Sequence, residues 1–204
     1  MSGMVQPKFV LLSSSPRRAE LLRRYGYEFQ IVRPQVGEFI LLQDVEPHQI
    51  AMLNAIRKFR SVKFDGVGLA ADTVVVLGNR VLGKPHDLDE ARRFLQLLSG
   101  KEHLVITAVV IGPAGDPSPT KLLETTKVKF MELGDFEIDY LLQADNPLDK
   151  AGGYAIQGAA GLFIERIEGD YTNVIGLPMP SVYLSLKHYG IRPKILNSAS
   201  LEDS

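Results

Sequence analysis

The feature that most constrains the fold is an apolar run that reverses direction across Gly78 and Asn79. Residues 74–77 read Val-Val-Val-Leu and residues 80–82 read Arg-Val-Leu. A Gly-Asn pair suits the two-residue turn of a β-hairpin, so these two runs are predicted to pair antiparallel. Elsewhere, strand-like runs and helical segments alternate along the chain. This mixed order predicts an α/β domain built on a mixed sheet.

The remaining elements follow from apolar periodicity and end signals. Ser15 is a candidate N-cap before Pro16, and Asp87 with Glu90 resembles a capping box. The expected strands are 9–12, 28–33, 103–111, 126–130 and 162–167. Helices are expected to start at 16, at 47 and directly after the cap at 87, and to span 135–144 and 180–189. Residues 9–192 are expected to form one domain between an N-terminal extension, 1–8, and a C-terminal tail, 193–204.

Composition narrows the functional classes. Hydrophobic residues make up 45% of the 204 residues and charged residues 23%, as in an ordinary folded protein. The formal net charge of −1 offers no overall basic field, so no extended nucleic-acid partner is expected. The absence of cysteine excludes thiolate nucleophiles. No secretory pattern and no run of about 18 apolar residues is found, so a cytoplasmic protein without a membrane partner is expected.

Asp72 is the first candidate for chemistry. It interrupts an apolar series between Val67 and the valine run. An ionised carboxylate in such a place costs several kcal/mol unless it is paired or binds a metal ion. A structural alternative is an aspartate at a strand end that accepts hydrogen bonds from nearby backbone amides. The isolated pattern leaves both interpretations open.

The hairpin register bears on whether Lys84 can join Asp72. Counting back from the turn, Thr73 lies opposite Lys84 and Asp72 lies opposite Pro85. Strict pleating then places the Asp72 and Lys84 side chains on opposite faces of the sheet. A shared pocket therefore requires a bulge, a frayed strand end or the reach of the long lysine side chain.

The segment 13–18 reads Ser-Ser-Ser-Pro-Arg-Arg at the start of a helix. Hydroxyls, unpaired helix N-terminal amides and two guanidinium groups together suit a phosphate chain. The alternative is a capped helix with two solvated arginines. Cations are mildly unfavourable beside the positive end of a helix, and this placement favours a bound anion.

A glycine-rich segment, 145–158, lets the backbone approach a ligand closely, and Gln157 offers a donor and an acceptor to a base edge. The alternative is a structural turn with an exposed glutamine. Neither a P-loop nor a dinucleotide-binding glycine pattern is present. Lys58 and Glu38 have no role that their own surroundings in the sequence indicate, and the four histidines lack metal-ligand spacing.

Seven motifs in this order resemble the Maf family, and the resemblance spans roughly residues 9–190. They are Ser13-x-Ser15-Pro16-Arg17-Arg18-x-Glu20-Leu21-Leu22, Ala71-Asp72-Thr73-Val74-Val75, Gly83-Lys84-Pro85, Leu98-Ser99-Gly100, Asp149-Lys150-Ala151-Gly152, Ile156-Gln157-Gly158 and Asn173-Val174-Ile175-Gly176-Leu177-Pro178. The resemblance implies a nucleoside triphosphate pyrophosphatase with a cleft in a two-lobed mixed α/β fold, similar to inosine triphosphate pyrophosphatases. It also implies a homodimer.

The resemblance also implies roles for individual residues. Asp72, Glu38 and Lys58 are the expected catalytic group, in which Asp72 activates water and Glu38 and Asp72 hold Mg²⁺ or Mn²⁺. The expected substrate-binding residues are Ser13, Ser15, Arg17, Arg18, Thr73, Lys84 and Gln157. One departure concerns the metal: residues 35–38 read Gln-Val-Gly-Glu where the family commonly shows Asp-x-Asp-Glu, so two usual carboxylates are missing beside Glu38.

The combination of Arg17, Lys84 and Gln157 looks like the Maf subgroup that favours dTTP and UTP. The Gln157 amide could read O4 and N3 of uracil or thymine with one donor and one acceptor, and modified pyrimidines fit equally. Two alternatives stay open. One is a house-cleaning pyrophosphatase of broad or purine-type preference, and the other is a nucleotide-sensing regulatory protein linked to cell division.

Overall fold

The structure is a computed structural model that describes residues 6–37 and 45–195. In this part of the chain, seven strands form one sheet in the order β2-β1-β3-β5-β6-β7, with β4 also paired to β3. β1 pairs parallel with β2 and β3, whereas all other pairs are antiparallel. The predicted α/β fold with a mixed sheet is confirmed. The strands are β1 (Phe9–Leu12), β2 (Gln30–Val32), β3 (Val67–Leu77), β4 (Arg80–Leu82), β5 (Glu102–Pro113), β6 (Thr120–Phe130) and β7 (Ile164–Glu168).

The hairpin at Gly78 and Asn79 forms as predicted, with Leu77 paired to Arg80. The extrapolated register beyond it is wrong. The ladder between β3 and β4 ends at Val75 and Leu82, after which the chain turns away. On the other edge of β3, Thr73 and Asp72 pair with Thr107 and Ala108 of β5. Because Lys84 lies outside the ladder, strand pleating does not fix the side of the sheet to which it points.

Along one edge of β3 there is a gap between the residues that pair with β1 and those that pair with β4. β5 pairs with β3 from Val67 to Val76 and so occupies the other edge. On the shared edge, β1 pairs with β3 as far as Ala70, and β4 begins to pair at Val75. Residues 71–74 of β3 therefore lie between the end of the ladder with β1 and the start of the ladder with β4. Asp72 and Thr73 lie in the gap.

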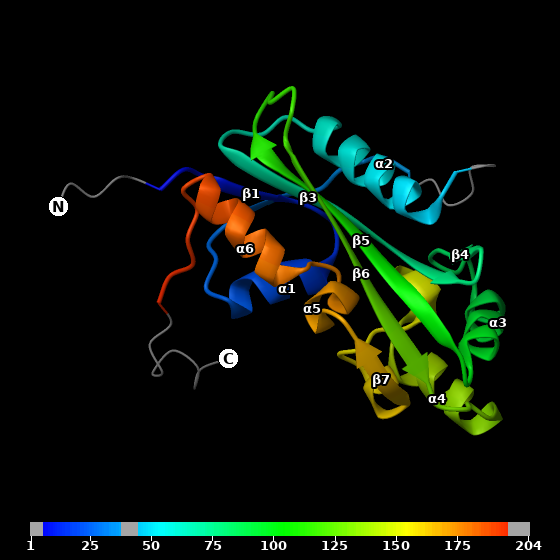
Figure 1. Cartoon of the computed structure of the whole chain (residues 1–204). Coiled ribbons are helices and arrows are strands. Elements are labelled where there is room, and N and C mark those ends of the chain that lie inside the picture. The colour runs from blue at the N-terminus through cyan, green and yellow to red at the C-terminus, as the bar shows by residue number, and fades with distance from the viewer. Residues whose placement is uncertain (1–5, 38–44, 196–204) are drawn as a thin grey trace.

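Helices cover both faces of the sheet (Figure 1). α2 packs on β3 and β5 from one side, and α1 and α6 lie on the other side. α3 and α4 pack together near the far ends of the long strands. The helices are α1 (Pro16–Arg24), α2 (Pro47–Arg60), α3 (Leu88–Leu98), α4 (Asp135–Ala144), α5 (Tyr171–Ile175) and α6 (Met179–His188), with short 3₁₀ turns η1 (Pro147–Asp149), η2 (Ala151–Gly153) and η3 (Ala159–Leu162).

The helix ends confirm the predicted signals only in part. Asp87 caps α3 by accepting from the Glu90 amide at 2.7 Å, but the Glu90 carboxylate accepts from His86 rather than from Asp87. Ser15 occupies the N-cap position of α1 without a side-chain capping bond. Its own amide donates to Ser13 Oγ at 3.1 Å instead. The Ser13 hydroxyl thus stabilises the turn between β1 and α1.

Three apolar clusters form the core. One lies between β1, α1 and α6, a second joins α3 and α4 to the far ends of β3, β5 and β6, and a third lies under α2. On α2, Ile50 and Phe59 are buried as predicted, but Leu53 is 42% exposed. A cavity opens between these packed regions.

Candidate active site

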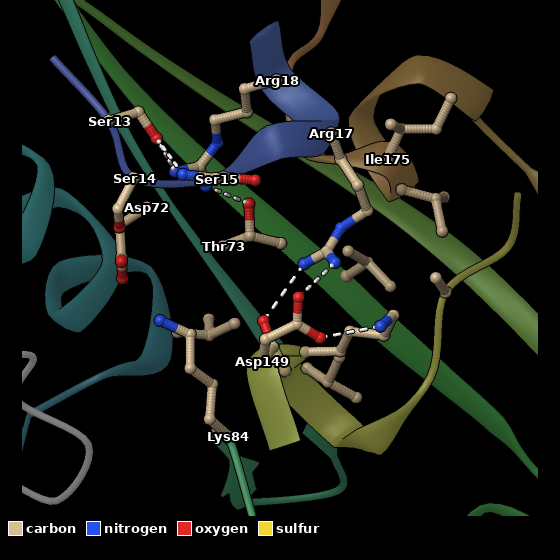
Figure 2. A pocket seen from close by; sticks show the side chains of 18 of the residues that line it. Ser13, Ser14, Ser15, Arg17, Arg18, Asp72, Thr73, Lys84, Asp149 and Ile175 are labelled. Atoms are coloured by element: carbon tan, nitrogen blue, oxygen red, sulfur yellow. Dashed lines mark hydrogen bonds and ion pairs between the residues drawn. The ribbon is translucent and has the colours of Figure 1, made fainter. Parts of the chain in front are cut away.

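A cavity of about 540 Å³ lies at the gap on the edge of β3 (Figure 2). Its size is that of a typical small-molecule site. The walls come from the turn after β1, from α2, from β3 and from the segment 148–157. They include Ser13, Ser15, Arg17, Arg18, Lys58, Asp72, Thr73, Lys84 and Gln157. Every predicted site residue except Glu38 therefore lines one cavity.

Asp72 is held by two side chains of α2. Its side chain is 5% exposed, and Lys58 Nζ donates to Oδ1 at 2.6 Å. Asn54 Nδ2 donates to Oδ2 at 3.1 Å. Asn54 and Lys58 are four residues apart, so they project from the same face of the helix. The cation and the amide offset the cost of burying the carboxylate and fix its orientation towards the cavity.

Asn54 was missed by the sequence reasoning. It is 2% exposed and sits within a helical run of otherwise apolar inward positions. The only signal in the sequence was its spacing of one helical turn from Lys58. A single asparagine at that spacing does not identify a partner that lies on a distant strand.

Arg18 is buried, and its guanidinium donates to backbone carbonyls and side-chain hydroxyls. Its Nε donates to Gly176 O at 2.9 Å, and Nη1 donates to Ala71 O at 2.8 Å and to Ser13 Oγ at 3.4 Å. Its Nη2 donates to Thr73 Oγ1 at 2.9 Å. The guanidinium thereby satisfies a carbonyl in the gap of β3 and ties α1 to the segment after α5. Its expected contact with phosphate stays a prediction.

A polar chain continues from Thr73 into the interior. Thr73 Oγ1 lies 2.9 Å from Thr107 Oγ1, and Thr107 Oγ1 lies 3.2 Å from Asn173 O. Asn173, which is fully buried, donates from Nδ2 to Val105 O and to Thr126 Oγ1, both at 3.0 Å. The cavity floor is therefore fixed by hydrogen bonds as well as by apolar packing.

Arg17 reaches across the cavity to Asp149 (Figure 2). Its Nη1 donates to Asp149 Oδ2 at 3.3 Å, and its Nη2 donates to Asp149 O at 3.2 Å. The other carboxylate oxygen, Oδ1, accepts from Lys150 Nζ at 2.7 Å. Burial raises the pKa of the Asp149 carboxyl, but hydrogen bonding and charge from Lys150 and Arg17 outweigh it and lower the pKa overall.

Lys84 and Gln157 are exposed side chains on two walls of the cavity. Lys84 follows the end of β4, and Gln157 lies in the glycine-rich segment as predicted. Gly158 allows this segment to pack closely, since a Cβ there would lie 2.0 Å from Asp145 Oδ2. Close packing of Gly158 against the Asp145 carboxylate, rather than contact with a ligand, therefore explains why a glycine stands at position 158.

Glu38 lies outside the described residues, so its predicted place beside Asp72 stays a prediction. Within residues 6–37 and 45–195, no three histidine or acidic side chains gather closely enough to form a metal site by themselves. Asp72 is the buried carboxylate in the cavity. Its oxygens accept from Asn54 and Lys58, and a carboxylate is also a preferred ligand of Mg²⁺.

Residues 8–189 match the family described as Maf-like protein. The chain belongs to the Maf family. Among curated Maf relatives, a dTTP/UTP pyrophosphatase of Anaeromyxobacter dehalogenans is 45% identical over 186 residues, which cover 90% of this chain and 95% of that protein. A dTTP/UTP pyrophosphatase of Bacillus cereus is 44% identical over 192 residues, or 93% of each chain.

A third Maf relative, the dTTP/UTP pyrophosphatase of Carboxydothermus hydrogenoformans, is 41% identical over 90% of this chain and 99% of its own. A solved HAM1 protein structure from Coxiella burnetii aligns with 60% of this Maf chain and 72% of its own, with a TM-score of 0.42 and 14% identity. No helix in the described part of the Maf chain is long and apolar enough to cross a membrane. The expected homodimer and cytoplasmic location stay predictions.

Proposed function

We propose that this Maf protein is a pyrophosphatase that hydrolyses dTTP and UTP between the α- and β-phosphates, releasing the nucleoside monophosphate and pyrophosphate. The observation that carries the proposal is the Asp72 carboxylate, fixed by Lys58 at 2.6 Å in the floor of a cavity that Arg17, Lys84 and Lys150 also line. The 41–45% identical relatives named dTTP/UTP pyrophosphatase support the choice of substrate.

The arrangement suits in-line attack of water on the α-phosphorus. Asp72 accepts the proton of the attacking water, whose oxygen forms the new bond to phosphorus. The bond between the α-phosphorus and its bridging oxygen breaks, and pyrophosphate leaves with that oxygen. Lys58 holds Asp72 in place and contributes positive charge near the phosphoryl group. Lys84 lines the cavity, and we propose that its ammonium binds the leaving phosphates.

A divalent ion, Mg²⁺ or Mn²⁺, fits this donor set. Mg²⁺ commonly binds through one or two carboxylates together with substrate phosphates and water, so Asp72, with Glu38 as the proposed second ligand, would suffice. When bound, the ion neutralises phosphate charge and polarises the attacked phosphoryl group. The two carboxylates missing beside Glu38 lead us to expect weaker metal binding than a larger acidic cluster would provide.

The base end of the cavity is proposed to include Gln157. Its side chain is exposed on the wall formed by the glycine-rich segment, where an amide can pair with O4 and N3 of a pyrimidine. Arg17 extends from the first turn of α1 to Asp149, which belongs to the same glycine-rich segment as Gln157. We therefore assign Arg17 to recognition of the nucleotide and Lys84 to the phosphates.

A nucleotide panel tests the proposal. The purified chain is incubated with each nucleoside triphosphate and with Mg²⁺ or Mn²⁺, and released pyrophosphate is measured. We expect dTTP and UTP to be hydrolysed with the highest kcat/KM and a chelator to abolish the reaction. A preference for ITP or XTP would replace the pyrimidine assignment with a purine-type activity, and phosphate release without pyrophosphate would refute α–β cleavage.

A further inference from the structure

The contact between Arg17 and Asp149 joins two walls of the cavity that are 132 residues apart in sequence. Arg17 belongs to the first turn of α1, and Asp149 ends the 3₁₀ turn η1. Both the carboxylate and the main-chain carbonyl of Asp149 accept from the guanidinium. Since a guanidinium is a rigid planar fork, bonds at two of its nitrogens define the plane of the whole group.

Asp149 is itself held on its other side. Lys150 has a side chain that is only 9% exposed, and its ammonium donates to Asp149 Oδ1 at 2.7 Å and to Asn146 O at 2.5 Å. A buried ammonium needs such partners to offset its lost hydration. The cavity therefore contains an ordered series of charges, Lys150, Asp149 and Arg17, in which the central carboxylate divides its two oxygens between two cations.

We propose that Asp149, anchored by Lys150, is a positioning residue that sets the orientation in which Arg17 meets the nucleotide and thereby supports pyrimidine preference. This inference rests on the proposed function, because it takes Arg17 as a nucleotide-binding group. An arginine side chain loses considerable rotamer freedom when it is fixed in one geometry. Asp149 removes that freedom before the substrate binds, so the nucleotide meets a group already oriented.

Charge alone makes the opposite prediction, which allows a sharp test. The nucleotide is a polyanion, so replacing Asp149 by a neutral residue makes the cavity more positive and should tighten binding if Asp149 acts only through its charge. If Asp149 positions Arg17, the same substitution should weaken binding in spite of the added positive charge. The sign of the change in KM distinguishes the two effects.

The main experiment compares Asp149→Asn with wild type by steady-state kinetics on dTTP and ITP. We expect KM for dTTP to rise about tenfold, as for loss of one charge-assisted contact, with kcat changed by less than about threefold. The preference for dTTP over ITP should fall by a similar factor. Asp65→Asn is the matched control, since it removes the same charge from an exposed ion pair with Lys8 outside the cavity. A KM for dTTP equal to or below the wild-type value in Asp149→Asn would overturn the proposal.

A second comparison separates positioning from general damage to the fold. In an Arg17→Gln background, Asp149→Asn should cause little further loss, because the group that it positions is gone. An undiminished loss in that background would show that Asp149 acts through the fold, and would also overturn the proposal. Asp149→Glu should retain part of the preference. Should Asp149→Asn not fold, Arg17→Lys keeps the charge without the fork, and an unchanged preference there refutes the role of orientation.

Binding of a non-hydrolysable α,β-methylene analogue of dTTP, measured by calorimetry, separates this inference from the proposed reaction. A wild-type chain that binds the analogue but hydrolyses no nucleotide would refute the proposed function, while the comparison of variants would still decide the role of Asp149. We expect weaker analogue binding in Asp149→Asn than in Asp65→Asn. Equal affinity of these two variants, or no binding to the wild type, would overturn the inference.

Discussion

The role of Asp72 can be isolated by exchanging the carboxylate with its amide partner. In the single variant Asp72→Asn, the new amide nitrogen must face a donor, because Lys58 donates to one oxygen of residue 72 and Asn54 donates to the other. In the double variant Asn54→Asp with Asp72→Asn, the amide at position 72 can donate to the new carboxylate at position 54 and still accept from Lys58. The exchange keeps the same charges and both hydrogen bonds but moves the carboxylate onto α2.

The two variants are expected to differ in stability but not in turnover. Loss of one charge-assisted bond in the single variant should cost about 1.5–3 kcal/mol, which lowers Tm by roughly 3–12 °C in a chain of this size. The exchange should restore most of that loss. Turnover should fall by about 10² to 10⁴ in both variants, because a positioned general base contributes about that factor, equivalent to roughly 2.7–5.5 kcal/mol of activation free energy.

The assay combines thermal unfolding with pyrophosphate release from saturating dTTP. Measuring at saturation separates the chemical step from substrate binding. If the exchanged variant regains stability and also turns over within about tenfold of wild type, the carboxylate at position 72 is not the base, since that factor lies below the range of a positioned acid or base. A loss of turnover without recovery of stability would show instead that the exchange did not rebuild the contacts.

Three further perturbations test the interior and the cavity wall. Asn173→Leu should lower the free energy of unfolding in urea by about 2–4 kcal/mol, because its two donor bonds to Val105 and Thr126 are lost, whereas exposed Gln143→Leu should change it little. Burial lowers the pKa of His103 from 6.5 to about 4, so the unfolded chain binds a proton at this residue between those pH values and the folded chain does not. Stability should therefore decrease by on the order of 3 kcal/mol as pH falls through this window, and His103→Gln should lose that part of the pH dependence. Gly158→Ala should displace the wall that carries Gln157, because the added Cβ would meet Asp145 at 2.0 Å, and raise KM for dTTP by about threefold or more. Wild-type KM in that variant would show that the wall adapts without loss.

The hairpin at Gly78 and Asn79 was predictable because its signal is local: two apolar runs and a two-residue turn specify both the pairing and its first register. The continuation of that register failed at Lys84 because the end of a ladder is decided by contacts elsewhere. Gly83 O accepts from Gly152 N at 2.9 Å, a bond to a segment far along the chain. Periodicity within residues 67–85 contains no information about that partner.

In the site, too, local sequence signals were informative and contacts between distant segments were not predicted. The resemblance to the Maf family indicated which site residues would gather, and those site residues that the structure describes line one cavity. The sequence did not show how they connect: Arg18 donates to distant carbonyls, and Asn54 supports Asp72 from another element. The short helix α5 was also missed, because five residues contain too little apolar periodicity to predict a helix.

The long strands have a consequence for how the protein folds. β3 supplies Leu69 to the core beside α1 and Val75 to the core beside α3, and β5 supplies Ile111 and Val105 to the same two cores. Because β3 and β5 each run through both cores, a fragment in which these strands stop at the cleft would leave each core without some of its residues. Unfolding of either region should thus remove the strands on which the other depends, which favours one cooperative transition over stepwise loss of two lobes. The cleft is then preserved until the whole sheet unfolds.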